Sequence, residues 1–377
     1  MTTNDDFAID ALAGFLPLAA RDRLAETLSA AEIDTLAHLA KAGTGPNSLR
    51  ALASDLAYLE AWARASTGGA LTWPAGEATV LRFIVHHLWD AAEREKNAGH
   101  GMPEEVAATL RAEGRLKCAG PHAPATVRRR LALWSSLHRW RGLEGPFSSP
   151  SIRNALRLAI RAANRPRGRK SPSAITRDVL DRLIATCGRG RAVDLRDRAL
   201  LLLAFGSGGR RRSEIARLKL EDLEEREPVP ADAKAQNGEK LPVLAIRLRR
   251  TKTSSADAGE SVLVVGRPVE ALRAWLAFSK IDAGPVFRRI DKWGNIGAAA
   301  LDPQSVNAMI KSRCAVAGLD PGEFSAQGLR SGYLTEAARA GVPLPEAMQQ
   351  SRHRSVQQAA RYYNEGEIAR GMAARLA

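Results

Sequence analysis

The stretch LLLLAFGSGGRRRSEIARL, at residues 200–218, decides what kind of fold this sequence can form. Its apolar opening continues a segment that begins at Asp194, and together they predict a helix that is buried on most sides. The run from Gly206 to Gly209 breaks that helix, because clustered glycines end regular structure. Helical spacing then resumes over residues 210–218. The stretch therefore predicts a buried helix, a glycine break and a second helical segment that begins with three arginines.

Downstream of this stretch the pattern predicts a small antiparallel sheet. Residues 241–249 alternate between apolar and other side chains, which is the period of a half-buried strand. Residues 261–265 form a second short apolar run, and the polar residues 251–260 between the two predict a hairpin turn. After Pro268 the chain is predicted to be mostly helical. The expected fold class is therefore mainly α with a small antiparallel β-sheet.

Upstream, apolar residues recur at helical spacing and predict several helices. The first is expected after Asn47, which would be its N-cap. The others are expected over residues 79–94, 103–111, 126–140 and 151–163.

A change in composition marks the end of this helical region. Residues 164–173 contain two prolines, a glycine and four basic side chains, which is typical of an interdomain linker. We therefore predict a helical extension of unknown role over 1–44, a helical domain over 45–165, a basic linker over 166–175 and a second domain over 176–377, ending in a tail helix.

The charge balance points to a polyanionic partner. Lys and Arg number 56 against 41 Asp and Glu, which gives a net charge of +15. Such an excess favours nucleic acid over a membrane surface, although a merely solvated basic surface is the alternative. Basic side chains are dense on the predicted helix 126–140 and in the linker, and we expect them to contact DNA or, alternatively, to be solvated. They are Arg128, Arg129, Arg130, Arg139, Arg167, Arg169 and Lys170.

Cysteines and hydropathy limit the other possibilities. Three cysteines that lie far apart do not suggest a disulfide framework, so a reducing compartment is expected. Cys118 and His122 have a loose metal-ligand spacing, but no second pair completes a zinc site, and no metal is predicted. Neither a secretory signal nor an apolar run of membrane-spanning length is seen. We expect a cytoplasmic protein without a membrane association, located at the nucleoid when bound to DNA.

Five residues near or beyond the glycine break provide the parts of a phosphodiester-cleaving site. A tyrosine can attack the phosphate, two guanidinium groups can bind its non-bridging oxygens, and a lysine can protonate the leaving oxygen. Alone, each residue has an ordinary structural explanation. In chain order they are Arg211, Lys252, Arg330, His353 and Tyr362, the last nine residues after His353.

Their order and context resemble those of the tyrosine recombinases, the phage integrase family. Residues 200–218 resemble that family's first arginine box, with Arg211 at the catalytic arginine and Glu214 at the supporting acidic position. Residues 251–253 resemble its mobile hairpin lysine. Residues 327–330 resemble its second box, and residues 353–355 resemble the box before the nucleophile. The resemblance covers about 175–365, and more loosely the helical region from about residue 45 as the family's core-binding domain.

The resemblance implies a function and a set of roles. Tyr362 would form a 3′-phosphotyrosyl bond with DNA, Arg211 and Arg330 would bind the phosphate, and Lys252 would act as general acid. The substrate would be double-stranded DNA with a specific recombination site, and no cofactor would be needed. A homotetramer on DNA is implied by the family, and accessory DNA-bending proteins are possible partners.

Three positions depart from the family pattern. Gln327 stands where histidine is common, and an amide can donate a hydrogen bond to phosphate but cannot shuttle a proton. Arg352 precedes His353 where glycine is usual, which would perturb the local turn. Tyr363 follows Tyr362 and is a rival nucleophile, but adjacent helical residues point about 100° apart, so only one can face the phosphate.

Other functions stay open on the sequence. A type IB topoisomerase would use the same chemistry without strict sites, and a telomere resolvase is a further variant. From another class, a non-cleaving DNA-binding accessory or regulatory protein would explain Gln327 as a sign of lost catalysis. Replacement of Tyr362 separates these, since a protein that only binds DNA does not need its hydroxyl.

Overall fold

The computed structural model describes residues 38, 46–117, 119–163, 171–231, 238–247 and 261–370. Several predicted features lie outside these residues. They are most of the extension over 1–44, Cys118, the linker side chains Arg167, Arg169 and Lys170, the hairpin residue Lys252, and the tail beyond Arg370.

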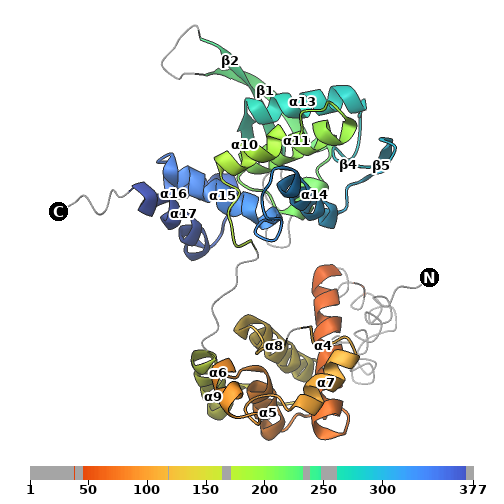
Figure 1. Cartoon of the computed structure of the whole chain (residues 1–377), viewed down its shortest axis with the longest axis vertical. Coiled ribbons are helices and arrows are strands. Elements are labelled where there is room, and N and C mark those ends of the chain that lie inside the picture. The colour runs from red at the N-terminus through yellow and green to blue at the C-terminus, as the bar shows by residue number, and fades with distance from the viewer. Residues whose placement is uncertain are drawn as a thin grey trace, which may run out of the picture. The chain divides into compact units, whose positions relative to one another are not determined.

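The chain divides into two compact units, Met1–Arg167 and Gly168–Ala377 (Figure 1). The division falls inside the proline- and arginine-rich segment at 164–173. Each unit has its own apolar core.

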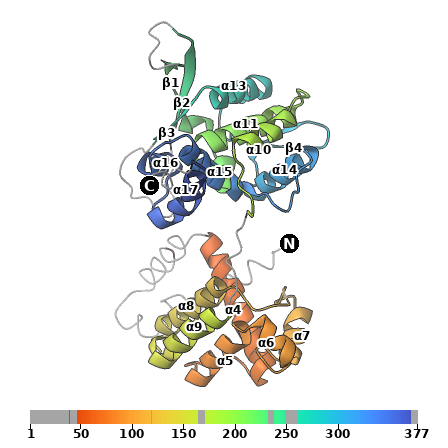
Figure 2. The ribbon, with the colours of Figure 1, turned by 60° about the vertical axis from the view of Figure 1, so that its left-hand side comes forward.

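The described part of the first unit is helical (Figure 2). Its elements are α4 (Pro46–Thr67), α5 (Glu77–His87), α6 (Ala91–Lys96), α7 (Glu104–Ala112), α8 (Pro124–Trp140), η2 (Pro146–Ser148) and α9 (Pro150–Ala162). Large apolar side chains spaced at three and four residues along α4, α5 and α8 bury themselves completely against one another. Trp62, Phe83 and Trp134 have no exposed surface, and their rings meet edge to face.

Two predictions for this unit need correction. Asn47 is not an N-cap, because α4 already begins at Pro46. The single helix expected over 79–94 is two helices, since Leu88 has an extended backbone at the end of α5 and Asp90 caps α6 by accepting a hydrogen bond from the Ala92 N–H. The buried Leu88 fits the apolar spacing of a continuous helix, so the spacing alone hid the break.

The second unit combines helices with two small antiparallel sheets, in agreement with the predicted fold class. Its helices are α10 (Arg177–Ala185), α11 (Ala192–Gly206), α12 (Arg212–Ala216), η3 (Leu220–Asp222), α13 (Arg267–Ser279), α14 (Pro303–Val316), α15 (Ala326–Arg339), α16 (Leu344–Ser351) and α17 (Val356–Arg370). Its strands are β1 (Leu223–Pro230), β2 (Lys240–Arg247), β3 (Ser261–Val265), β4 (Arg288–Ile290) and β5 (Ile296–Ala300).

The first sheet has the order β1–β2–β3, with β2 antiparallel to both neighbours. The predicted strands correspond to β2 and β3, whereas β1 and the β4–β5 pair were not predicted. The expectation that β2 is half buried is wrong, because Val243, Leu244, Ala245 and Ile246 are all buried. Residues on both faces of β2 are buried, so its side chains lack the alternation of a strand with one solvated face.

Helix α11 is the centre of the second unit (Figure 1). Leu200, Leu201 and Leu203 on it have no exposed surface, as the apolar stretch predicts. Helix α11 packs on α13 and α15, and α15 in turn packs on α16 and α17. The segment after α11 is thereby brought against the elements that carry the C-terminal part of the chain.

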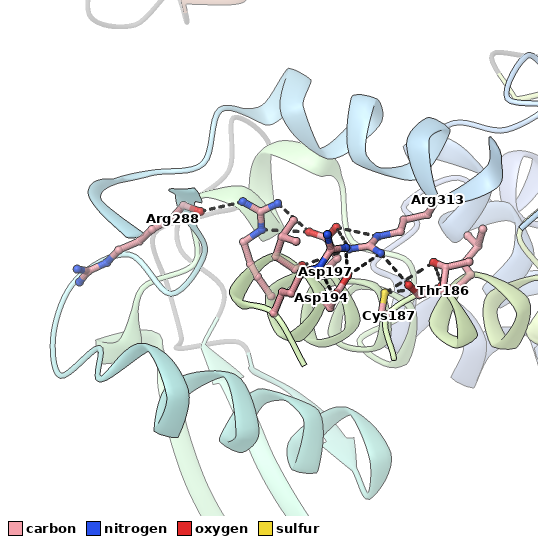
Figure 3. Close-up of polar contacts among 10 residues, drawn as sticks. Thr186, Cys187, Asp194, Asp197, Arg288 and Arg313 are labelled. Carbon is pink, nitrogen blue, oxygen red and sulfur yellow. Dashed lines mark hydrogen bonds and ion pairs between the residues drawn. The ribbon is translucent and has the colours of Figure 1, made fainter. Parts of the chain in front are cut away.

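A buried ion-pair network fixes α11 from its other end (Figure 3). Arg313 of α14 donates two hydrogen bonds to Asp197, at 2.7 and 2.9 Å, and pairs with Asp194 at 2.9 Å. Arg196 donates to the second oxygen of Asp197 at 2.8 Å and to the backbone carbonyl of Arg288 at 3.2 Å. The network therefore joins α11 to α14 and to β4, the strand that begins at Arg288.

Candidate active site

The glycine break after α11 is what allows distant segments to meet. Gly208 and Gly209 have φ values of +90° and +70°, in the left-handed region that favours glycine. A Cβ atom on Gly209 would lie 2.2 Å from the Arg330 Cα, and one on Gly208 would lie 2.4 Å from the Gln350 carbonyl oxygen. The turn before Arg211 thus packs backbone to backbone against α15 and the end of α16.

Arg211 stands at the N-terminus of α12 and is held by Glu214. Its backbone N–H donates to the Glu214 carboxylate at 3.3 Å, and its Nη1 donates to the other oxygen at 2.6 Å. Just over half of the Arg211 side chain, 53%, is exposed. The carboxylate fixes one edge of the guanidinium and leaves a large part of it accessible.

Arg330 is buried in α15 beside this turn. It is 5% exposed, and its Nη1 donates to the Gly209 carbonyl at 3.2 Å. Its Nε donates to Nε2 of His353 at 3.1 Å. Burial, followed by the nearby charges of Arg211 and Arg210, lowers the Arg330 pKa to about 10. Arg330 is still protonated at neutral pH, and these positive neighbours favour a negatively charged ligand beside it.

His353 is held as a neutral imidazole. Because Nε2 accepts a hydrogen bond from Arg330, the ring proton is on Nδ1, which donates to the Ser351 hydroxyl at 2.8 Å. Burial and the charges of Arg330 and Arg211 lower the His353 pKa to about 3. Arg352 does not disturb the preceding turn, since it adopts the left-handed conformation, with φ +58°, that a glycine would take. That conformation costs a non-glycine residue about 1–2 kcal/mol.

The two adjacent tyrosines of α17 are in different environments. Tyr363 is 6% exposed, and its hydroxyl donates a short hydrogen bond to the backbone carbonyl of Val342. Tyr362 is partly exposed, and its backbone carbonyl accepts a hydrogen bond from Thr335 of α15 at 3.2 Å. Its phenol is close enough to Arg330 to act on the arginine's pKa, which it tends to raise. Tyr362 therefore lies near Arg330, whereas the hydroxyl of the buried Tyr363 is engaged with the backbone of Val342.

Gln327 and Lys252 are the two remaining predicted site residues. Gln327 lies in the first turn of α15, one turn before Arg330, and it is exposed. Lys252 lies outside the described residues. Strands β2 and β3 pair up to Arg247 and Ser261, which is the pairing expected on either side of a hairpin.

The arginines predicted to contact DNA in the first unit separate into two groups. Arg128, Arg129 and Arg139 are exposed on α8, although Arg129 also donates to Asp55 at 2.8 Å. Arg130 is only 11% exposed at its side chain and is engaged within the unit. It donates to Asp55 at 3.3 Å and lies 3.3 Å from the centre of the Tyr58 ring.

Sequence reasoning missed two contributors to this site. Arg210, which lies beside the motif position of Arg211, is 4% exposed and donates from Nη2 to the Gln350 carbonyl at 2.6 Å. Ser351 is fully buried and fixes the His353 ring. A run of three arginines offers no signal that separates a buried member from exposed ones. A single serine offers none either.

Two further features bear on the chemistry. Within the described ranges, no group of three or more His, Cys, Asp or Glu side chains is arranged to hold a metal ion. Among the same residues, no helix combines the length and hydrophobicity needed to cross a membrane.

Comparison with known proteins gives a consistent result. Residues 173–367 match the model of the phage integrase family. The chain is 30% identical over 251 residues to an integrase/recombinase xerD homolog of Selenomonas ruminantium, covering 64% of this chain and 69% of that protein. It is 28% identical over 244 residues to recombinase cre of Escherichia phage P1, covering 60% of this chain and 66% of that protein.

Solved structures show the same fold. The XerH site-specific recombinase bound to difH substrate, in a pre-cleavage complex, aligns with a TM-score of 0.53 at 14% identity, covering 98% of this chain and 94% of the other. A post-cleavage complex of XerH aligns with a TM-score of 0.50 at 15% identity, covering 91% and 83%.

Proposed function

This chain belongs to the phage integrase family, and we propose that it acts as a site-specific DNA recombinase with Tyr362 as its nucleophile. The Tyr362 oxygen would attack the scissile phosphate, form a 3′-phosphotyrosyl bond and release a 5′-oxygen that takes up a proton. The 5′-hydroxyl of a second duplex would then attack this bond and regenerate the tyrosine. The phosphodiester energy is kept in the covalent intermediate, so strand exchange needs no external energy source.

The observation that supports this most strongly is the charge of the site. Three guanidinium groups and a neutral imidazole converge there, and among the described residues Glu214 is the carboxylate that pairs with them. An excess of positive charge in a partly buried site favours a phosphate, and it would be strongest where charge builds up on the pentavalent transition state.

Each side chain then has a role. Arg211, which is half exposed, and Arg330, whose pKa is lowered, would bind the non-bridging oxygens. Glu214 would position Arg211 through their 2.6 Å ion pair. Gln327 would donate an amide hydrogen bond to the phosphate and take no part in proton transfer.

Two groups remain for proton transfer and orientation. Lys252 would supply the proton to the leaving 5′-oxygen. His353 is neutral at physiological pH and hydrogen-bonds Arg330, so it would orient that guanidinium.

The first unit would act as the DNA-binding core domain over residues 45–165. Exposed basic side chains on α8 and α9 would contact the phosphate backbone, with the linker residues Arg167, Arg169 and Lys170 adding to them. On α8 and α9 they are Arg128, Arg129, Arg139, Arg153, Arg157 and Arg161. Arg130 would instead support α8 from within the unit.

The partners are those expected of the family. The substrate would be double-stranded DNA with a specific recombination site, bound by a homotetramer, with accessory DNA-bending proteins as candidate further partners. When bound, the protein would be found at the nucleoid.

Covalent trapping in cells tests the proposal. Cells that express the wild type, Tyr362→Phe or Tyr363→Phe are denatured, and protein-linked DNA is recovered and sequenced. We expect discrete sites with the wild type and Tyr363→Phe, and none with Tyr362→Phe, although all three bind DNA. Tyr363→Phe removes the same atom from the adjacent residue and loses one hydrogen bond, worth about 1 kcal/mol of stability.

Two results would contradict the assignment. Trapped DNA with Tyr362→Phe but not with Tyr363→Phe would move the nucleophile to Tyr363. Intact DNA binding without trapped DNA in any variant would favour a non-cleaving accessory protein.

A further inference from the structure

Arg210 is a buried charge to which the proposed mechanism assigns no contact with the phosphate. Its side chain is 4% exposed, and its Nε has no hydrogen-bond partner among the described residues. The nearest carboxylate oxygen, on Glu214, lies 3.9 Å from Nη1, and Glu214 is already engaged with Arg211 at 2.6 Å. A buried guanidinium with so little compensation is costly. Its retention beside Arg211 points to a role other than stability.

The one short contact of Arg210 reaches the segment that carries His353. Its Nη2 donates to the backbone carbonyl of Gln350 at 2.6 Å. Gln350 lies in the last turn of α16, where carbonyls lack partners within the helix and attract positive charge. Ser351 and His353 follow directly, so Arg210 fixes the end of the helix from which the imidazole is presented.

The side chain of Gln350 extends this connection to two more segments. Its Nε2 donates to the Gly206 carbonyl at 3.0 Å and to the Leu263 carbonyl at 2.7 Å. Gly206 is the last residue of α11, just before the turn to Arg211, and Leu263 is in β3, the strand after the predicted hairpin of Lys252. Gln350 therefore joins three segments: the end of α16 before His353, the end of α11 before Arg211, and β3 after the predicted hairpin of Lys252.

We infer that Arg210 and Gln350 are a pair of positioning residues, which hold the His353 segment and β3 against the turn of Arg211 and thereby set the rate of DNA cleavage. The inference rests on the proposed function. Neither residue is assigned a contact with the reacting phosphate. Their effect is geometric, and a displacement of about 1 Å in a catalytic group can lower a rate by about 100-fold.

A positioning role and a structural role of Arg210 predict opposite changes in the stability of the second unit when its charge is removed. Methionine fills a volume similar to that of arginine without the charge, and replacing a poorly compensated buried ion by an apolar residue is often neutral or stabilising. Arg210→Met should therefore keep or raise the melting temperature of the second unit while it slows cleavage. If Arg210 were mainly structural, stability and cleavage would fall together.

The kinetic test uses a nicked duplex that carries the site recovered by covalent trapping. Covalent-complex formation is followed in a single turnover for the wild type, Arg210→Met, Gln350→Ala, the double variant and the control Arg217→Met. Arg217 is an exposed arginine at the end of α12, so the control removes the same charge from the same segment. DNA affinity and the melting temperature are measured on the same samples.

We expect Arg210→Met to slow covalent-complex formation by at least about 10-fold, with DNA affinity within about 2-fold of the wild type. Gln350→Ala should also slow covalent-complex formation. The double variant should be within about 3-fold of the slower single variant, since both disturb one contact. A rate for Arg210→Met within about 3-fold of the wild type would overturn the inference. A parallel loss of melting temperature, DNA binding and cleavage would also overturn it, and if Arg210→Met does not fold, the same criteria apply to Gln350→Ala.

A spectroscopic readout is independent of DNA and of the proposed function. With ¹⁵N-labelled histidine, the wild type should show His353 as a single Nδ1–H tautomer, identified by the signal that is lost in His353→Gln. Arg210→Met should show a mixture of ring states, because the end of α16 is released. An unchanged tautomer in Arg210→Met would refute positioning even if cleavage is slow. If the wild type does not cleave DNA but Arg210→Met still shows the mixture of ring states, the result would count against the proposed function and not against the positioning role.

Discussion

The second unit contains two arginine clusters that differ in their charge balance. In the network beneath α11, two buried arginines are matched by two carboxylates, one of which also pairs with the exposed Arg191. These are Arg196 and Arg313 with Asp194 and Asp197. Among the described residues of the candidate active site, two buried arginines and the half-exposed Arg211 share one carboxylate. These are Arg210, Arg211 and Arg330 with Glu214.

The pKa values reflect this difference. Burial is the largest influence on the pKa of Arg313 and acts to lower it, but Asp197, Cys187 and Asp194 together raise the pKa above its usual value. Burial lowers the pKa of Arg330 to about 10, and the neighbouring arginines lower it further instead of compensating. A balanced cluster is complete without a ligand, whereas an unbalanced one is stabilised by an added anion. Charge balance thus separates the proposed catalytic arginines from the structural ones more clearly than burial does.

The largest expected effect is on catalysis at the unbalanced cluster. Arg330→Met should lower covalent-complex formation by about 1,000-fold, equivalent to about 4 kcal/mol, because a charged donor to the transition state is lost. Stability should be kept or raised, since the remaining arginines repel one another less. Single-turnover cleavage and thermal unfolding of the same samples check both parts. A variant that melts far earlier than the wild type would show that Arg330 belongs with the structural arginines.

The next effect is on stability at the balanced network. Asp197→Asn should lower the free energy of unfolding of the second unit by about 3–5 kcal/mol, because it leaves two buried guanidiniums with insufficient negative charge. Urea unfolding measures this. Asp181→Asn is the matched control, since Asp181 forms an exposed ion pair with Arg267 at 2.8 Å and should change little. If both variants lowered the free energy of unfolding equally, the buried network would contribute no more to stability than an exposed ion pair.

The smallest expected effect is on the pH dependence of folding. The pKa of His353 is lowered to about 3 in the folded chain, so between pH 6.5 and 3 the unfolded chain binds the additional proton and stability falls as the pH falls. Between pH 7 and pH 5, the wild type should lose about 1 kcal/mol more than His353→Gln, allowing for solvent screening at a partly exposed ring. Urea unfolding at both pH values measures the difference. An identical loss in the two chains would mean that the imidazole is not held neutral.

Much of this protein was predictable from local sequence. Apolar spacing determined α4, α8 and α11, because a helix that buries one or more faces must repeat apolar residues at its own period. The glycines at 208 and 209 and the strands β2 and β3 were also readable, since positive φ values and extended segments each favour particular residues. The candidate catalytic residues could also be recognised in chain order, because the chemistry of phosphodiester cleavage restricts which side chains can take part.

Other features depended on which segments meet in space. Apolar spacing misjudged the end of α5 before Leu88, and it misjudged the burial of residues 243–246 on both faces of β2, because burial depends on the elements packed around a strand. The sequence gives Arg210, Arg211 and Arg212 the same identity, and only the close packing of the glycine turn on α15 and α16 makes the first of them buried. Likewise, Tyr363 is buried with its hydroxyl bonded to Val342, whereas Tyr362 stays partly exposed. Residue type is encoded locally, but burial and hydrogen-bond partners come from contacts between residues far apart in the chain, and those contacts assign the roles.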